Sequence, residues 1–240
     1  NGYQEVVLTG IHTGNYGVDL DTNFAHLLKE LIKIKGLKRL RISSIEATEL
    51  TDEVLKVIKE SNVIVDHLHI PLQAGSDEIL KAMNRKYDLA YFFKKIEDIR
   101  KIRPNISITT DVIVGFPGET RELFEKTIET CRKLEFAKIH VFPYSERKGT
   151  KAIELPNHVD SSEKKSRARE LLLVSKELEI AYAEKFIGKT EEVLIEENKD
   201  DYSLGHTSNY LHVKIPRTIK PNTFVSVTIK EVEYPYCLGE

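Results

Sequence analysis

The sequence predicts an α/β protein, a partial (β/α) barrel of parallel strands that is followed by a small all-β barrel. Short apolar runs alternate with segments whose apolar residues recur at helical spacing, which is the pattern of β-α repeats with right-handed crossovers. After residue 188 the pattern changes to short strands that are separated by turn residues, which favours a small barrel. We therefore expect one domain over residues 1–188, including a linking helix, and a second over residues 189–240.

Composition excludes several classes of protein. The chain has 240 residues, of which 40% are hydrophobic and 31% charged, so it is large enough for a buried core. No apolar run approaches the roughly 20 residues that a membrane span needs, and we expect no membrane partner. The net charge of −2 gives no overall bias toward nucleic acid, so an RNA surface would have to be local. The two cysteines match no metal or redox spacing and suit a reducing cytoplasm.

The first β-α unit begins with a nearly all-apolar strand over residues 5–9, as expected for a parallel sheet covered on both faces. The loop 10–17 (GIHTGNYG) holds three glycines and His12, which allows either close backbone approach to a ligand or a plain turn. A helix then begins at Phe24, and Gly36 is a natural stop.

The second unit has a strand over residues 39–44 that leads to Glu46, and Thr51 is placed to cap the next helix. The third unit is DHLHIPLQAGSD, residues 66–77. Its apolar residues alternate with His67 and His69, a period of two that leaves both histidines on the face away from the covering helices. The strand ends at Gln73, and Ser76 can cap a short helix.

The remaining units continue the alternation. A helix over residues 89–102 precedes a strand over 107–114, which carries Asp111 in an apolar setting and leads into the loop GFPGET. A fifth strand over 138–142 follows. A long helix, capped by Ser161 or Ser162, then ends near residue 188. Three short strands, at 192–195, 211–215 and 224–232, complete the second domain.

Polar residues converge at the carboxyl ends of the predicted strands. These residues are His12, Glu46, Gln73, Asp111, and Tyr144 with Ser145 and Arg147. Carboxyl ends of parallel strands meet at one edge, where barrels of this kind have their active sites, so we interpret the edge as a functional mouth. Arg41, His67, His69, Asp111 and His140 fall on the face toward the lumen. The paired histidines could share a metal, but we prefer pairing with lumen carboxylates because no third ligand is evident.

Five ordered runs resemble the radical S-adenosylmethionine methylthiotransferases, the MiaB/RimO group. The runs are EVVLTGIHTGNYG, RISSIEATEL, DHLHIPLQAGSDEILKAMNRKYD, TTDVIVGFPGET and HVFPYSERKGT. The module after Lys189 is similar to the family's TRAM domain. The GIHTG form of the first loop is closest to the MtaB branch, which adds a methylthio group to N6-threonylcarbamoyladenosine beside the tRNA anticodon. Two alternatives are a branch that modifies an aspartate of a ribosomal protein and a non-catalytic RNA-binding module.

The resemblance also implies cofactors and partners. These are tRNA, S-adenosylmethionine, two [4Fe-4S] clusters in the full-length enzyme and an electron donor protein. It implies cofactor contacts, without assigning a catalytic residue or a metal ligand in this chain, at Thr9, Gly10, His12, Thr13, Glu46, Gln73, Ser76, Asp111, Gly115, Phe142 and Tyr144. The first four would lie near the methionine amino group and the next three at polar and ribose contacts. Asp111 and Gly115 would lie beside the adenine, with Phe142 and Tyr144 on the neighbouring strand.

The family's CxxxCxxC loop is expected before Asn1. Three closely spaced thiolates are needed to hold a radical cluster, and neither Cys131 nor Cys237 can replace them. The chain also starts without methionine. We therefore expect a piece of a longer enzyme that binds no cluster and is inactive alone.

Overall fold

Five parallel strands form the first part of the chain in a computed structural model that describes residues 2–240. They are β1 Glu5–Leu8, β2 Arg39–Ile42, β3 His67–His69, β4 Ser107–Val114 and β5 Lys138–Pro143. β1 pairs with β2, while β3, β4 and β5 form a second sheet. A parallel bridge between Leu40 and Ile64 connects the two sheets. The strands run in sequence order as an open arc, so the α/β class is confirmed and a partial barrel fits.

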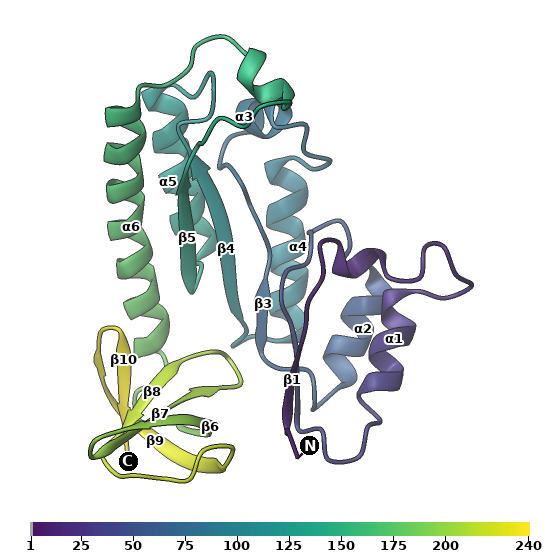
Figure 1. Ribbon diagram of the computed structural model, residues 1–240, viewed down its shortest axis with the longest axis vertical. Coiled ribbons are helices and arrows are strands. Elements are labelled where there is room, and N and C mark those ends of the chain that lie inside the picture. Colours follow the sequence, from purple (N-terminus) through teal and green to yellow (C-terminus); the bar gives the residue numbers. More distant parts are fainter. Residues whose placement is uncertain (1) are drawn as a thin grey trace.

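Helices cover the outside of the arc (Figure 1). They are α1 Phe24–Leu31, α2 Asp52–Glu60, α3 Asp77–Ala82, α4 Leu89–Ile102, α5 Arg121–Leu134 and α6 Ser161–Glu184, with the 3-10 turns η1 Thr13–Asn15 and η2 Lys151–Glu154. Thr51 caps α2 as predicted, by accepting from the amide of Val54. Ser76 occupies the N-cap position of α3, but its side chain makes no capping hydrogen bond. The N-cap of α6 is Asp160, not Ser161 or Ser162. Within residues 2–240, no helix combines the length and apolarity needed to cross a membrane.

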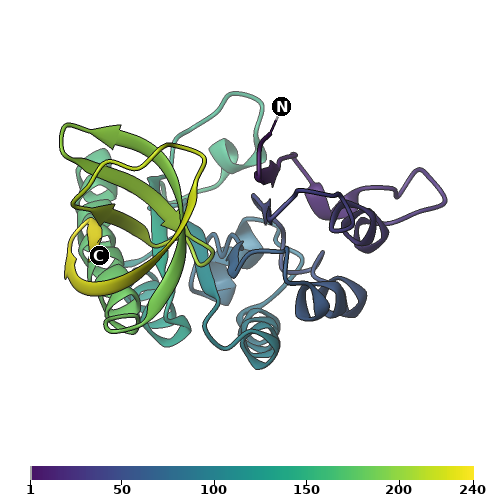
Figure 2. The same cartoon turned by 90° about the horizontal axis from the view of Figure 1, so that it is seen from below.

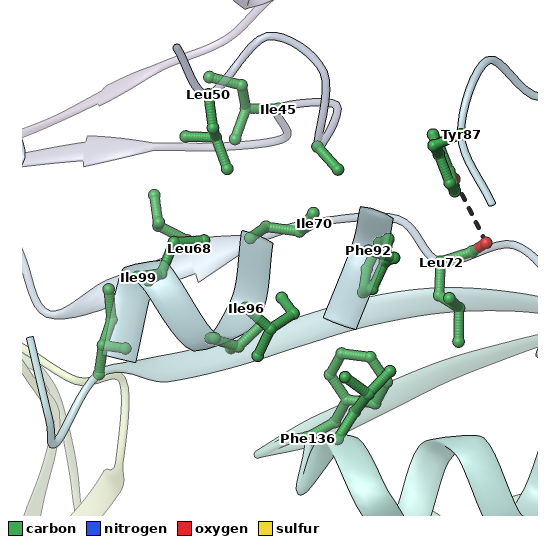
Figure 3. Close-up of a cluster of buried hydrophobic side chains, with 14 of the residues drawn as sticks. Ile45, Leu50, Leu68, Ile70, Leu72, Tyr87, Phe92, Ile96, Ile99 and Phe136 are labelled. Carbon is green, nitrogen blue, oxygen red and sulfur yellow. Dashed lines mark hydrogen bonds between the residues drawn. The ribbon is translucent and has the colours of Figure 1, made fainter. Parts of the chain in front are cut away.

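The main core lies between the strands and these helices. Leu68, Ile70 and Leu72 are fully buried on the helix side, as the alternation predicts. Figure 3 shows them among side chains of α4, including Phe92 and Ile96. Burying a large apolar side chain of this kind stabilises the fold by about 1.5 to 3 kcal/mol. The third strand is therefore fixed in register by its apolar face, and its histidines must face the lumen.

The second part is a closed barrel in the order β10-β8-β7-β6-β9. Its strands are β6 Thr190–Lys199, β7 Tyr202–Thr207, β8 His212–Ile215, β9 Phe224–Glu233 and β10 Tyr236–Gly239. The sequence pattern did not indicate β7 or β10. On β7, Ser203, Gly205 and Thr207 pair with apolar residues of β6 or β8, and small or polar residues there hide the alternation. Gly205 is required, because a Cβ would lie 2.1 Å from the carbonyl oxygen of Leu194.

This barrel lies against the amino ends of the parallel strands, opposite the mouth (Figures 1 and 2). Arg39, at the start of β2, donates to the carbonyl oxygens of Glu192 and His206, the latter at 2.9 Å. Its guanidinium also lies 3.5 Å from the carboxylate of Glu5. The end of α6 contributes Tyr182 to the barrel's core, and the turn after it contributes Phe186. The domain boundary near residue 188 stays a prediction, because the two cores share this helix.

Candidate functional site

The carboxyl ends of β4 and β5 and the segment after β3 enclose a mouth cavity of about 470 Å³. Four of the predicted residues line it, namely Gln73, Asp111, Phe142 and Tyr144. Phe116 and Arg147, which the prediction of cofactor contacts left out, also line it. The rings of Phe116 and Tyr144 meet edge to face at 5.1 Å, and the buried Tyr144 hydroxyl has no hydrogen-bond partner within residues 2–240. The cavity therefore combines aromatic faces with polar groups.

Gln73 reaches this cavity because the strand before it is interrupted. Pro71 has no N–H to donate, and the regular ladder of β3 ends at His69. The Thr110 hydroxyl replaces the missing ladder bonds, since it accepts from the Leu72 amide and donates to the Ile70 carbonyl, both at 2.8 Å. Gln73 then pairs with β4 again, in a left-handed conformation with φ of 68°. Left-handed backbone is rare outside glycine and often marks a functional position.

A chain of polar side-chain contacts runs from the mouth into the lumen. The Asp111 carboxylate lies 3.2 Å from Nε2 of His69, and the other ring nitrogen of His69 lies 2.9 Å from the Thr109 hydroxyl. The same hydroxyl lies 3.0 Å from Nε2 of His67. The prediction of a histidine paired with a lumen carboxylate is confirmed for His69, whereas His67 pairs with a threonine. His69 holds the Asp111 carboxylate in place at the edge of the cavity.

His67 and His140 are kept neutral by their surroundings. Burial, followed by the positive charge of Arg41, lowers the pKa of His67 from 6.5 to about 3. Burial also lowers the pKa of His140, whose ring lies 5.5 Å from that of His69. Neutral imidazoles at these two positions add no positive charge to the lumen, where the Arg41 guanidinium is paired with the Glu5 carboxylate.

The β-barrel closes the floor of the lumen with a stack of rings. The Tyr210 ring lies 4.8 Å from that of His67, with the guanidinium of Arg41 at 4.5 Å from the same tyrosine ring. The stack continues through His206 to His212, each step being under 5 Å. Nothing in the sequence near these residues indicates this floor, because it joins segments that are far apart along the chain.

Two further cavities hold the remaining predicted residues of the first two units. One, of about 370 Å³, is lined by His12 and Glu46, together with Arg85, which the prediction missed. The carboxylate of Glu46 lies 2.8 Å from the guanidinium of Arg85. Arg85 could have been found from the sequence, because it lies in NRKYD, the end of one of the five runs that resemble the methylthiotransferases. The other cavity, of about 340 Å³, is lined by residues of the first loop, namely Thr9, Gly10, His12 and Thr13.

Ser76 and Gly115 line none of these three cavities. Ser76 is 1% exposed. Gly115 donates its N–H to the carboxylate of Glu119 at 2.8 Å, and a Cβ at Gly115 would lie 2.5 Å from Cγ of Lys164. Arg167 holds the same carboxylate of Glu119 at 2.7 Å, and burial raises the pKa of Glu119. Helix α6 therefore supports the GFPGET loop from behind, and contacts of Ser76 or Gly115 with a cofactor stay predictions.

The chain is similar to a family of known enzymes. A model described as "Radical SAM superfamily" matches residues 1–131. The threonylcarbamoyladenosine tRNA methylthiotransferase MtaB of Bacillus subtilis (strain 168) is 43% identical over all of this chain and 55% of its own length. The tRNA-2-methylthio-N(6)-dimethylallyladenosine synthase of Desulfitobacterium hafniense (strain Y51) is 39% identical, again over all of this chain and 55% of its own. The chain thus spans about half the length of these relatives.

A solved structure shows the same fold. Coproporphyrinogen III oxidase (HemN) from Escherichia coli, described as a radical SAM enzyme, aligns with a TM-score of 0.58 and 18% identity. The alignment covers 73% of this chain and 40% of that protein. At this identity the likeness concerns the fold alone.

The low pKa of His67 predicts a pH-dependent stability. The unfolded chain takes up a proton at His67 below pH 6.5, whereas the folded chain does so only near pH 3. Stability from this site is therefore present above pH 6.5 and is lost as the pH falls toward 3, by up to about 1.4 kcal/mol per unit. Urea denaturation across this range will show a shallower pH slope for His67→Phe, while the exposed control His26→Gln keeps the parent slope. Equal slopes for all three proteins would contradict the prediction.

Proposed function

The chain belongs to the radical SAM superfamily, and on this premise we propose that it is part of a tRNA methylthiotransferase. The observation that carries the proposal is the mouth cavity, where Gln73, Asp111, Phe142 and Tyr144 meet. These residues come from three of the runs that resemble the methylthiotransferases. Identity of 43% and 39% with two enzymes named as acting on tRNA adenosines supports the same assignment.

We propose N6-threonylcarbamoyladenosine as the nucleoside that is methylthiolated. Three relatives carry that nucleoside in their names, two at 43% identity and one at 37%, and the first loop reads GIHTG as in the MtaB branch. Five relatives named for N(6)-dimethylallyladenosine are 36% to 40% identical, so the identities support the enzyme class more strongly than the choice of nucleoside.

S-adenosylmethionine fits the mouth cavity. The Asp111 carboxylate and the Gln73 amide offer hydrogen bonds to hydroxyl or amino groups, and the rings of Phe142 and Tyr144 offer apolar faces to an adenine. We propose that these four residues hold the cofactor, with Thr9, Gly10, His12, Thr13 and Glu46 at the neighbouring loops. When bound, S-adenosylmethionine supplies radical chemistry, while this chain binds and orients it and excludes water. His69 fixes the orientation of the Asp111 carboxylate.

An iron–sulfur cluster does not fit the residues present. Cys131 and Cys237 are buried in two different cores, and burial raises the pKa of their thiols to about 12 and about 11. Across residues 2–240, no three or more His, Cys, Asp or Glu side chains are grouped to hold a metal ion. We therefore propose that these 240 residues neither assemble a [4Fe-4S] cluster nor turn over alone.

The β-barrel and the partners complete the proposal. We propose that the closed barrel of residues 190–239 is a TRAM-like domain, with the boundary near residue 188. An electron donor protein and a cytoplasmic location follow from the family resemblance and stay predictions.

The cofactor assignment predicts that Asp111→Asn weakens binding of S-adenosylmethionine by about tenfold, because a charged hydrogen bond contributes about 1.5 to 3 kcal/mol. Equilibrium dialysis of the labelled cofactor against the 240-residue chain measures this, with the exposed Glu154→Gln as the matched control. Unchanged affinity of the Asp111 variant would remove Asp111 from the site.

The cluster assignment predicts substoichiometric iron. After anaerobic reconstitution and desalting, the chain should hold far less than four iron atoms per molecule, and Cys131→Ala with Cys237→Ser should hold no less than the parent. Iron and sulfide analysis and the visible absorption spectrum measure this. A stoichiometric [4Fe-4S] centre on the parent chain would overturn the proposal.

The nucleoside assignment predicts the effect of deleting the gene. Mass spectrometry of tRNA nucleosides should show loss of 2-methylthio-N6-threonylcarbamoyladenosine, with its unmethylthiolated precursor in its place. Loss of methylthiolated dimethylallyladenosine instead would move the chain to the other tRNA class. Unchanged tRNA with an unmodified ribosomal-protein aspartate would support the rival enzyme, and no change in either would leave an RNA-binding module.

A further inference from the structure

The tip of the hairpin between β7 and β8 reaches from the barrel to the floor of the lumen. The Asp66 amide, just before β3, donates to the Ser208 hydroxyl at 2.9 Å, and the Arg41 guanidinium donates to the Ser208 carbonyl at 3.5 Å. These bonds fix the tip beside the first residue of β3. Two residues further along the tip, the Tyr210 ring lies 4.8 Å from the His67 ring and 4.5 Å from the Arg41 guanidinium.

Tyr210 occupies this position in an unusual backbone conformation. Its φ of 67° is left-handed, a region that glycine and asparagine enter far more readily than a bulky aromatic residue. The contacts of Tyr210 with His67, His206 and Arg41 are all made by its ring. Strained positions of this kind often belong to functional residues. The backbone alone would favour glycine here, so we attribute the tyrosine to what its ring contacts.

The contacts between His67 and the mouth run in one direction. An ionised carboxylate repels the lone pair of a bare ring nitrogen, so Nε2 of His69, 3.2 Å from the Asp111 carboxylate, carries the proton. Nδ1 of the neutral His69 ring then accepts from the Thr109 hydroxyl at 2.9 Å. Because that hydroxyl has only one hydrogen to donate, it accepts from Nε2 of His67 at 3.0 Å. His67 is therefore the first donor and Asp111 the final acceptor.

The first donor depends on Tyr210. Burial lowers the pKa of His67, so its ring is neutral, and its buried Nδ1 has no hydrogen-bond partner among the described residues. A buried N–H without a partner is rarer than an acceptor without one, which places the proton on Nε2. One hydrogen bond to Thr109 and packing against the Tyr210 ring then orient His67. Polar contacts in series strengthen one another, so disorder at His67 weakens the contacts that follow.

We propose that Tyr210 of the barrel is a positioning residue for the Asp111 carboxylate. Its ring orients His67 as the first donor, and the contacts through Thr109 and His69 transmit that orientation to the mouth. The inference rests on the proposed function, in which Asp111 contacts the cofactor. The barrel thereby acts on a cavity whose described lining comes from the arc and from the segment after β5.

Equilibrium dialysis of labelled S-adenosylmethionine against the 240-residue chain tests this role. Tyr210→Gly should weaken binding by about threefold to tenfold, as expected when one member of a coupled network is lost. Tyr210→Phe keeps the ring and should bind as the parent does. The barrel control Tyr202→Ala, whose ring contacts Lys214 instead, should also keep the parent affinity.

Two further comparisons separate positioning from folding. Glycine suits a φ of 67°, and Tyr210 is 47% exposed, so Tyr210→Gly leaves no sealed void and should keep the parent's urea midpoint. In the Asp111→Asn background, Tyr210→Gly should cause no further loss of affinity, because its effect passes through that carboxylate. A role in folding alone would lower the midpoint and would not depend on Asp111.

Nitrogen NMR of isotope-labelled histidine follows the same contacts without the cofactor. In the parent chain, His67 and His69 should both carry the proton on Nε2. In Tyr210→Gly, the two ring nitrogens of His69 should shift toward averaged values, while the exposed His26 keeps its spectrum. A proton on Nδ1 of His69 in the parent would contradict the direction of the contacts.

The outcomes distinguish this inference from the proposed function. If the parent binds S-adenosylmethionine and Tyr210→Gly binds it equally well, the positioning role is wrong and the proposed function stands. A further loss in the Asp111→Asn background would also overturn the role, because Tyr210 would then act by another route. If the parent binds no cofactor, the cofactor assignment fails, and the histidine spectra decide alone. A His69 spectrum that is unchanged in Tyr210→Gly would then overturn the positioning role.

Discussion

Two neighbouring threonines of β4 determine how the third strand meets the mouth. A strand that contains proline cannot complete its ladder, and an unpaired buried backbone group costs free energy comparable to a lost hydrogen bond. The Thr110 hydroxyl supplies both missing bonds around Pro71, while Thr109 bonds the two histidines on the other face. With both faces satisfied, the segment holds its register as far as Gln73. The position of Gln73 and Asp111 in one cavity depends on this pairing.

Much of the parallel arc could be predicted from the sequence, because its elements follow simple periodicities. The bounds of β4 and α4 agree with prediction, since each is a long run with a clear pattern and a clear stop at Pro104 or at the glycine loop. The alternation of the third strand also assigned the lumen face correctly. Within the β-barrel the same reasoning missed β7. The inward positions of this strand are small or polar residues, and Gly205 lies too close to the backbone of β6 for any larger residue.

The candidate site was less predictable than the fold. The alternation predicts that polar residues gather at one edge of the sheet, but it does not predict which of them share a cavity. The structure distributes most of the predicted residues over three cavities. Ser76 illustrates the limit, because a residue at a strand end can turn into the core instead of the mouth. Arg85 and Tyr210 were missed for a different reason, since each acts through a partner from a distant segment. Only tertiary packing brings such partners together.

Helix α6 has a consequence for dividing the protein into pieces. Its first turns hold Glu119 behind the mouth, while its last turn and the turn that follows it place Tyr182 and Phe186 in the barrel's core. At about 1.5 Å per residue, its 24 residues span about 36 Å as one continuous rod. A truncation at Gly188 would expose the apolar residues Tyr182 and Phe186 to solvent. An isolated barrel would lack these two side chains in its core. The point where the sequence changes character is therefore a poor place to cut, and a piece that keeps α6 attached to the barrel is the better design.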